Sequence, residues 1–168
     1  MNRLPLALLP LLAACVPAGH LDELARPAPV FDPVAFFTGH TRGVGTLKIV
    51  FSGPKQTLVE GHGHREGDTL VLDQRVKKGD EAATTRQWRL RPAGNGRWTG
   101  TLTDASGPVT AEVSGNRLHI DFAMKGGTHA EQWLYLNARG DVATNRMVVT
   151  KFGIPVASLD ETITHLDD

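Results

Sequence analysis

Apolar and polar residues alternate with a period of two along most of the chain after residue 30. In segment 117–124 the alternate positions are Leu, Ile, Phe and Met, and in segment 69–77 Gln74 is the polar exception on an otherwise apolar face. Because successive side chains of a strand point to opposite faces, this pattern predicts strands with one buried and one solvated face. We expect ten strands, over residues 43–52, 56–66, 69–77, 84–91, 97–104, 108–114, 117–125, 130–137, 142–151 and 155–165.

The breaks between these strands are short and have the chemistry of hairpin turns. Glycine, asparagine and aspartate, which tolerate positive φ, occupy the breaks at 94–96, 114–116 and 139–141. Connections of this length join antiparallel neighbours and leave no room for a crossover helix. The sequence therefore predicts an all-β fold, an up-and-down antiparallel β-barrel of about eight to ten strands whose closure removes exposed edges. A two-sheet sandwich is the alternative.

One short N-terminal helix is expected before the first strand. Asp32 is a suitable N-cap, Pro33 fits the first helical position, and Gly39 ends the apolar segment that follows. The composition changes from Pro- and Gly-rich to alternating near Phe31, so the barrel domain is expected to span residues 31–168.

The N-terminus has the organisation of an export signal. Arg3 precedes an apolar run that ends in small residues just before Cys15, the single cysteine of the chain. The run is too short for a membrane-spanning helix, which needs about 20 residues. Residues 1–14 are therefore expected to be a signal peptide, and residues 15–30 the modified cysteine followed by a flexible spacer.

The segment Leu12-Ala13-Ala14-Cys15 resembles the lipobox of bacterial lipoproteins. That resemblance implies cleavage before Cys15, lipidation of its thiol, and acylation of the new N-terminus, with palmitate among the expected acyl groups. An ordinary secretory signal with an incidental cysteine is the alternative. An aspartate directly after the cysteine would resemble an inner-membrane retention signal, but residue 16 is a valine. We therefore expect an outer-membrane lipid anchor facing the periplasm of a bacterial cell envelope.

Composition narrows the possible partners. The chain has 168 residues, which suits one domain after the leader, and its 18 Lys+Arg balance 18 Asp+Glu. Zero net charge argues against a nucleic-acid partner, since such a protein must neutralise many phosphates. A single cysteine forms no internal disulfide and no cysteine-rich zinc site.

Several short motifs, taken in their order and spacing, resemble a family of proteobacterial lipoproteins known as domain of unknown function 3833. The resemblance covers the domain from Phe31 to the C-terminus and implies a lipocalin-like barrel, but it implies no reaction and no catalytic residues. The motifs are Phe36-Phe37-Thr38-Gly39, Gly43-Val44-Gly45, Leu72-Asp73, Arg86-Gln87-Trp88, Asn145-Arg146-Met147 and Lys151-Phe152-Gly153-Ile154-Pro155-Val156.

His62 and His64 have the most metal-like spacing in the chain. In a regular strand both side chains point the same way, so two imidazoles could share one zinc ion, with His119 or His129 as a possible third ligand. Polar residues at alternate positions also describe an ordinary solvated face, and glycines beside both histidines weaken the strand. We favour the solvated face and predict no cofactor.

A set of large side chains on the predicted strands could line a ligand cavity or fill a dry core, because small barrels have room for either. Arg146 is the candidate for an inward charge, with stacking of its guanidinium on a tryptophan as the alternative. Asp73 and Arg75 are interpreted as exposed, ion-pairing residues. The apolar cavity candidates are Trp88, Trp98, Phe122, Met124, Trp133 and Met147.

Three functions fit these features. The favoured one is a lipid-anchored periplasmic lipoprotein that binds an apolar small molecule, such as a fatty acyl chain or a lipid, in the barrel. A structural or assembly lipoprotein that binds an unidentified envelope protein is the alternative. An enzyme acting on lipids through His119, Glu131 or Arg146 is the third, although no serine lies in a Gly-x-Ser-x-Gly setting.

Overall fold

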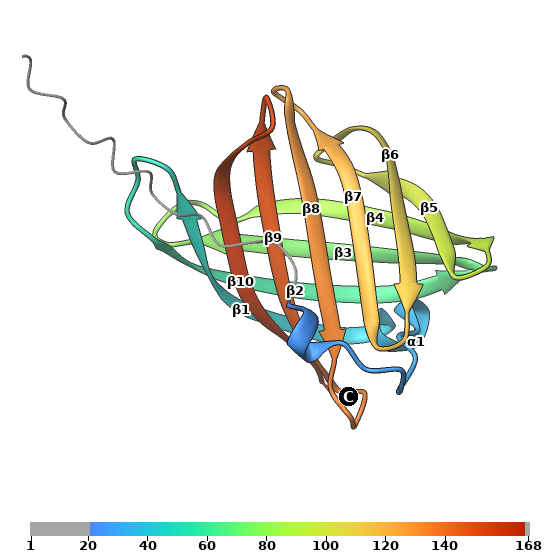
Figure 1. Ribbon diagram of the computed structural model, residues 1–168. Helices are drawn as coiled ribbons and strands as arrows, with labels where there is room; N and C mark the ends of the chain where they lie inside the picture. The colour runs from blue at the N-terminus through green and yellow to red at the C-terminus, as the bar shows by residue number, and fades with distance from the viewer. Residues whose placement is uncertain (1–20, 167–168) are drawn as a thin grey trace, which may run out of the picture.

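The computed structural model describes residues 21–166 and shows a closed antiparallel barrel (Figure 1). Strands follow one another in chain order around the barrel, and β1 pairs with β10 to complete the closure. The predicted up-and-down barrel is therefore confirmed, and closure rules out the two-sheet sandwich. The strands are β1 (Gly39–Ile49), β2 (Lys55–Glu66), β3 (Thr69–Lys78), β4 (Thr84–Gly94), β5 (Arg97–Leu102), β6 (Ala105–Ser114), β7 (Arg117–Met124), β8 (Thr128–Leu136), β9 (Val142–Lys151) and β10 (Ile154–Leu166).

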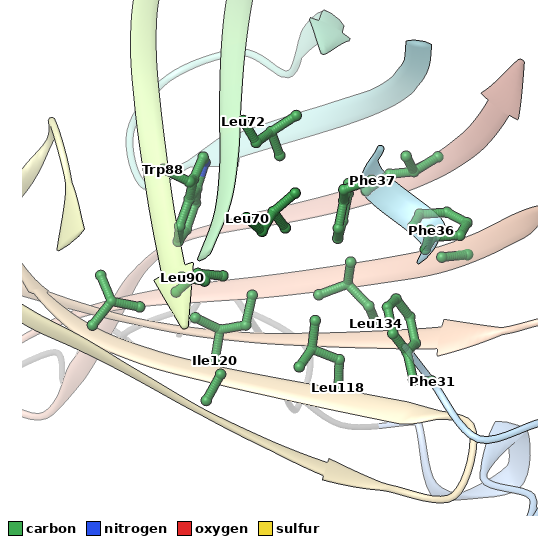
Figure 2. Close-up of a cluster of buried hydrophobic side chains, with 14 of the residues drawn as sticks. Phe31, Phe36, Phe37, Leu70, Leu72, Trp88, Leu90, Leu118, Ile120 and Leu134 are labelled. Carbon is green, nitrogen blue, oxygen red and sulfur yellow. The ribbon is translucent and has the colours of Figure 1, made fainter. Parts of the chain in front are cut away.

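The short helix α1 (Pro33–Phe37) closes one end of the barrel, and Figure 2 shows its Phe36 and Phe37 among the buried apolar side chains. Asp32 caps it, because its Oδ1 accepts hydrogen bonds from the backbone N–H of Val34 (2.9 Å) and Ala35 (3.1 Å). Phe36 packs against Phe31 and Phe37 with ring centroids 5.3 and 4.9 Å away. The predicted capped helix is confirmed, and its aromatic side chains plug what we call the closed end.

The opposite end, which we call the open end, carries the turns β1–β2, β3–β4, β5–β6, β7–β8 and β9–β10. No helix covers it within residues 21–166. Inward side chains near the closed end, such as Leu70, Leu118 and Leu134, are fully buried. Towards the open end, inward side chains such as Met124 and Val149 are only half-buried against the same core. Solvent therefore reaches the interior from the open end.

The described part of the predicted spacer, residues 21–30, is hydrogen-bonded to the barrel, which the prediction of a flexible spacer did not include. This segment begins with Leu21, whose N–H donates to Tyr135 Oη at 2.9 Å, and continues as a 3-10 turn at Asp22–Leu24. Asn116 in the β6–β7 turn holds this segment: its Oδ1 accepts from Arg26 N (2.7 Å), and its Nδ2 donates to Leu24 O (3.1 Å) and Leu136 O (2.8 Å). Composition missed this because the partner lies about 90 residues away.

Within residues 21–166, the structure has no helix that is both long and apolar enough to cross a bilayer. The predicted signal peptide, residues 1–14, and the predicted lipidation site Cys15 lie outside the described residues.

Candidate functional site

Five of the seven predicted cavity residues face the barrel interior. Trp88 and Phe122 are buried and meet edge to face, with ring centroids 5.5 Å apart. Met124, at the end of β7, and Met147 on β9 are half-buried against the same cluster. Together they form an apolar wall that extends towards the open end.

Trp98 lies in a different place, at the closed end where β5 begins. There it lines a groove of about 770 Å³ between α1 and the β2–β3 and β4–β5 turns. Val34 and Val113 are apolar neighbours in this groove, and Arg65 and Asp68 are polar ones. Trp98 thus packs against the same interior core, but at the closed end and away from the wall that leads to the open end.

Trp133 and Arg146 lie on the outer face, which corrects both predictions. Interior positions on β8 and β9 are taken by Leu134 and Asn145, each no more than 1 % exposed, so their immediate neighbours in sequence must face outwards. The guanidinium of Arg146 pairs with Asp160 at 2.6 Å on that face. The predicted inward charge was placed one residue out of register, and such a shift exchanges the two faces of a strand.

The inward charge is Arg86 instead. It alternates on β4 with the buried residues Trp88 and Leu90, and its register partner on β3 is Gln74. Arg86 Nε donates to Gln74 Oε1 at 2.8 Å, and Trp88 Nε1 donates to the same oxygen at 2.9 Å. The guanidinium carbon lies 5.7 Å from the Trp88 ring centroid, within cation–π range. Gln74 and Trp88 thus fix the orientation of the guanidinium inside the barrel.

Arg86 has no carboxylate partner at salt-bridge distance among the described residues. Burial lowers its pKa, while the more distant carboxyls of Glu161 and Asp104 raise it in part. The group nevertheless remains charged, because arginine does not lose its proton in proteins. The interior therefore contains a half-buried cation whose only close hydrogen-bond partner within residues 21–166 is the neutral Gln74.

Glu161 on β10 is the second polar group of the interior, and its side chain is only 7 % exposed. Asn145 Nδ2 donates to Glu161 Oε2 at 2.8 Å. Glu161 Oε1 and Asn145 Oδ1 have no hydrogen-bond partner within residues 21–166. Burial raises the pKa of Glu161, and this effect exceeds the lowering by Asn145 and Arg86.

Two glycines on β1 make the space for Glu161. A Cβ at Gly43 would lie 2.8 Å from the Glu161 carboxyl carbon, and one at Gly45 would lie 2.8 Å from Glu161 Cβ. The Gly-Val-Gly motif of the sequence is thus explained by packing against Glu161. We name Arg86, Gln74, Asn145 and Glu161 the interior polar set.

Sequence reasoning identified none of this set as a site, although a clue was present. Gln74 and Glu161 both occupy positions of the alternation that are otherwise apolar, Glu161 between Leu159 and Ile163. A polar residue in the apolar register of a strand is the pattern that reveals such a site.

The histidines proposed as metal ligands do not converge with a third ligand. His62 stacks on His40 with ring centroids 4.6 Å apart, and His40 Nε2 lies 2.7 Å from Glu60 Oε2. His64 instead contacts Glu66 at 3.3 Å. Residues 21–166 contain no cluster of three or more His, Cys, Asp or Glu that could hold a metal ion.

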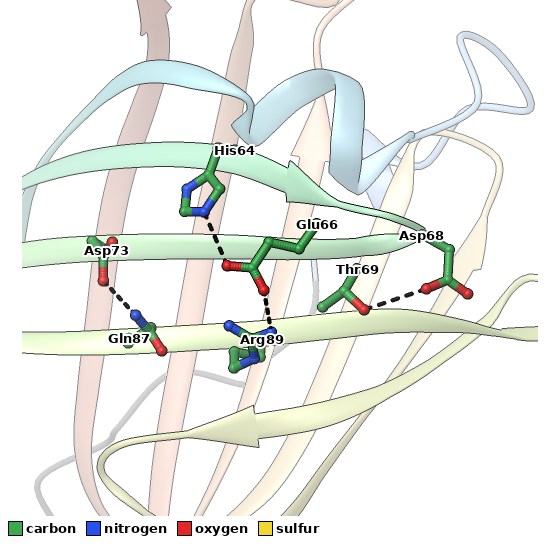
Figure 3. A network of polar contacts seen from close by, with 7 residues as sticks. All are labelled: His64, Glu66, Asp68, Thr69, Asp73, Gln87 and Arg89. Carbon is green, nitrogen blue, oxygen red and sulfur yellow. Dashed lines mark hydrogen bonds and ion pairs between the residues drawn. The ribbon is translucent and has the colours of Figure 1, made fainter.

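The remaining polar candidates form networks on the outer wall. Figure 3 shows Asp73 accepting a hydrogen bond from Gln87 Nε2 (2.8 Å), and nearby Glu66 bridging His64 and Arg89. Asp73 and Arg75 are both exposed, as predicted, but Asp73 pairs with the glutamine.

The residues predicted for the enzyme alternative also face outwards. His119 stacks on Trp133 with ring centroids 5.0 Å apart and lies 3.4 Å from Glu131. His119, Glu131 and Arg146 share no interior site, so the enzyme alternative loses the residues proposed for it.

Comparison with known proteins places the chain by family and by fold. A family model described as "Protein of unknown function (DUF3833)" matches residues 9–165. A comparison with curated protein sequences finds no match. Among solved structures, the S-type phycobiliprotein lyase CPES from Guillardia theta is similar with a TM-score of 0.63 and 7 % identity, covering 80 % of this chain and 91 % of that one.

Two further structures have the same fold. Rv2717c from M. tuberculosis matches with a TM-score of 0.61 and 16 % identity, covering 78 % of this chain and 93 % of its own. A protein of unknown function from the DUF3598 family of Nostoc punctiforme matches with a TM-score of 0.61 and 12 % identity, covering 85 % of this chain and 51 % of its own. These likenesses confirm the lipocalin-like barrel.

Proposed function

The chain belongs to the DUF3833 family of proteins of unknown function, and we propose that it binds an apolar molecule with an acidic head group, such as a fatty acid, inside the barrel. We also propose that it does so as a lipoprotein of the bacterial cell envelope, anchored through Cys15 and facing the periplasm. The lipobox-like segment Leu12-Ala13-Ala14-Cys15 supports the anchor. The barrel interior supports the ligand.

The observation that carries the ligand proposal is the charge of Arg86 in an apolar barrel. A cation withdrawn from water is costly unless an anion or several hydrogen bonds compensate it. Here Gln74 supplies one neutral acceptor, and no described carboxylate supplies a salt bridge. A ligand carboxylate would provide the missing counter-charge through charge-assisted hydrogen bonds.

The walls around Arg86 suit an alkyl chain. Trp88 and Phe122 are buried and apolar, and the flexible Met124 and Met147 line the way to the open end. Methionine adapts its shape to irregular apolar partners, and pockets of this kind combine many apolar residues with a few fixed polar groups. The tail would therefore lie along the methionines while the head meets Arg86.

The test compares two probes of equal chain length, palmitate and hexadecanol, by titration calorimetry on delipidated full-length protein. Arg86→Gln keeps a polar side chain but removes the charge. We expect it to weaken palmitate binding roughly 10- to 100-fold, because hydrogen bonds to charged groups contribute about 1.5–3 kcal/mol. Hexadecanol binding should change little.

Arg91→Gln is the matched control, since Arg91 is an exposed arginine on the outer face of the same strand. It should leave both affinities unchanged. Absence of palmitate binding to the wild type, or equal palmitate affinity in Arg86→Gln and Arg91→Gln, would refute the proposal.

A further inference from the structure

All six lysines of the chain lie at the open end of the barrel, although they are far apart in sequence. Each stands within one residue of the strand end that borders an open-end turn, in β1, β2, β3, β7 and β9. None of the arginines within residues 21–166 stands that close to an open-end turn; they lie along the strands and at the closed end. The six are Lys48, Lys55, Lys77, Lys78, Lys125 and Lys151.

Two phenylalanines project from the same end, and none of residues 21–166 buries their rings. Phe51 in the β1–β2 turn is fully exposed, and Phe152 in the β9–β10 turn is 91 % exposed. The two turns are neighbours, because β1 pairs with β10 and Val50 N donates to Val156 O at 2.9 Å. We name Phe51, Phe152 and the 66 % exposed Ile154 beside them the apolar tip.

Stability of the isolated barrel does not explain these phenylalanines. Phe51 has φ of 62° and Phe152 has φ of 52°, in the left-handed region that bulky residues rarely adopt. Glycine or asparagine would fit such turns at lower energy, and burial of the rings offers no compensation here. Within residues 21–166 no contact accounts for two large apolar side chains in these positions, and we attribute them to an external contact.

The charge around the tip indicates what that contact is. The Lys151 ammonium lies 5.9 Å from the Phe152 ring centroid, and Lys48 and Lys55 flank the other turn. Lys55 pairs with Glu81, and Lys48 is 3.9 Å from Asp160. In a dimer formed through this end, the lysines of one copy would face the lysines of the other and repel them. An anionic surface with an apolar layer beneath it would instead pair with the lysines and accept the apolar tip.

We infer that the open end docks on a lipid bilayer that contains anionic lipids, with the apolar tip inserted among the acyl chains and the lysines over the head groups. Aromatic side chains favour this boundary, and each basic residue near an anionic surface adds attraction. Docking would set the mouth of the barrel against the bilayer, where apolar ligands reside. The inference depends only on the exposed residues of the open end and does not require that the barrel binds a ligand.

The test is sedimentation of full-length protein with two kinds of vesicle, phosphatidylcholine with phosphatidylglycerol and phosphatidylcholine alone. Phe51→Ser/Phe152→Ser and Lys48→Glu/Lys151→Glu should each reduce binding to the anionic vesicles by about tenfold or more. Residues 1–20 are the same in every variant, so differences between variants report on the open end.

Matched controls change the closed end. Val30→Ser removes a 65 % exposed apolar residue there, and Arg91→Glu/Arg97→Glu reverses the same amount of charge. Both controls should bind the anionic vesicles like the wild type. Equal losses at the two ends, or no loss in the tip variant, would overturn the inference, as would tip-dependent dimerisation without tip-dependent vesicle binding.

A Phe152→Trp variant gives a readout that does not rely on loss of binding. Its added fluorescence should be quenched by lipids brominated on their acyl chains, and absence of quenching would contradict insertion. If Arg86→Gln fails to affect palmitate while these differences persist, the docking stands and the ligand proposal falls. If Arg86→Gln weakens palmitate binding while the tip variants bind vesicles like the wild type, the ligand proposal stands and the docking falls.

Discussion

The interior polar set can be tested through the space that Gly43 leaves for Glu161. An alanine at residue 43 would place its Cβ 2.8 Å from the Glu161 carboxyl carbon and 3.4 Å from its Cγ, with Oε1 closer still. Real Cβ atoms essentially never come within 3 Å of such an atom, so the Glu161 side chain must move. Overpacking of this kind costs about 1–3 kcal/mol.

The strain should vanish when the clashing atoms are removed. In a Glu161→Ala background, the three atoms nearest to the new Cβ, which are Oε1, Cδ and Cγ of Glu161, are absent. Gly43→Ala should then be neutral, or stabilising by about 0.5–1 kcal/mol, because alanine loses less conformational freedom in a strand than glycine. The two substitutions should therefore show a coupling of about 1–3 kcal/mol in a double-mutant cycle.

Gly45→Ala is the matched control. Its Cβ would meet the backbone oxygen of Asp160 at 2.5 Å and Glu161 Cα at 2.9 Å, and truncation of Glu161 removes neither atom. It should destabilise equally in both backgrounds. The assay is urea unfolding at pH 7, with the free energy of unfolding taken from the midpoint at constant slope. A Gly43→Ala penalty that persists in Glu161→Ala would refute the packing argument.

Two further predictions concern stability. Burial raises the pKa of Glu161 above its ordinary 4.5, so the folded state holds the proton more tightly than the unfolded chain. The stabilisation that results from this tighter proton binding is complete below pH 4.5 and is lost as the pH rises through the folded-state pKa of Glu161. Glu161→Gln should therefore flatten the fall of unfolding free energy between acid and neutral pH; an unchanged slope would contradict the assignment. Asn116→Ala removes three hydrogen bonds to segment 24–26 and Leu136 and should cost about 2–4 kcal/mol. It should also expose residues 21–30 to limited proteolysis, and resistance equal to the wild type would show that other contacts hold them.

Local structure was largely predictable because it depends on near neighbours. The alternation in β7 and the turn residues at 94–96 and 114–116 determined strands and hairpins directly. Asp32 and Pro33 likewise determined the start of α1. Predicted strand limits differ from the observed ones by a few residues, the largest difference being the early start of β1 at Gly39.

Which face of the sheet a given side chain occupies was less predictable, since it depends on the register of the strand. Arg146 and Trp133 were assigned to the interior from their residue types, but their neighbours Asn145 and Leu134 occupy it. Residue type alone favours tryptophan inside and asparagine outside, and here the register overrides that preference.

The sequence by itself determined the strands, the capped helix and the up-and-down barrel, because each follows from periodicity and turn chemistry within a few residues. Only the tertiary structure decided that Arg86 from β4 and Glu161 from β10 share one interior, and that six scattered lysines surround two exposed phenylalanines. Closure of the barrel brings strands from opposite ends of the chain together. Contacts between such distant strands depend on the geometry of the whole sheet, so no pattern among neighbouring residues predicts them.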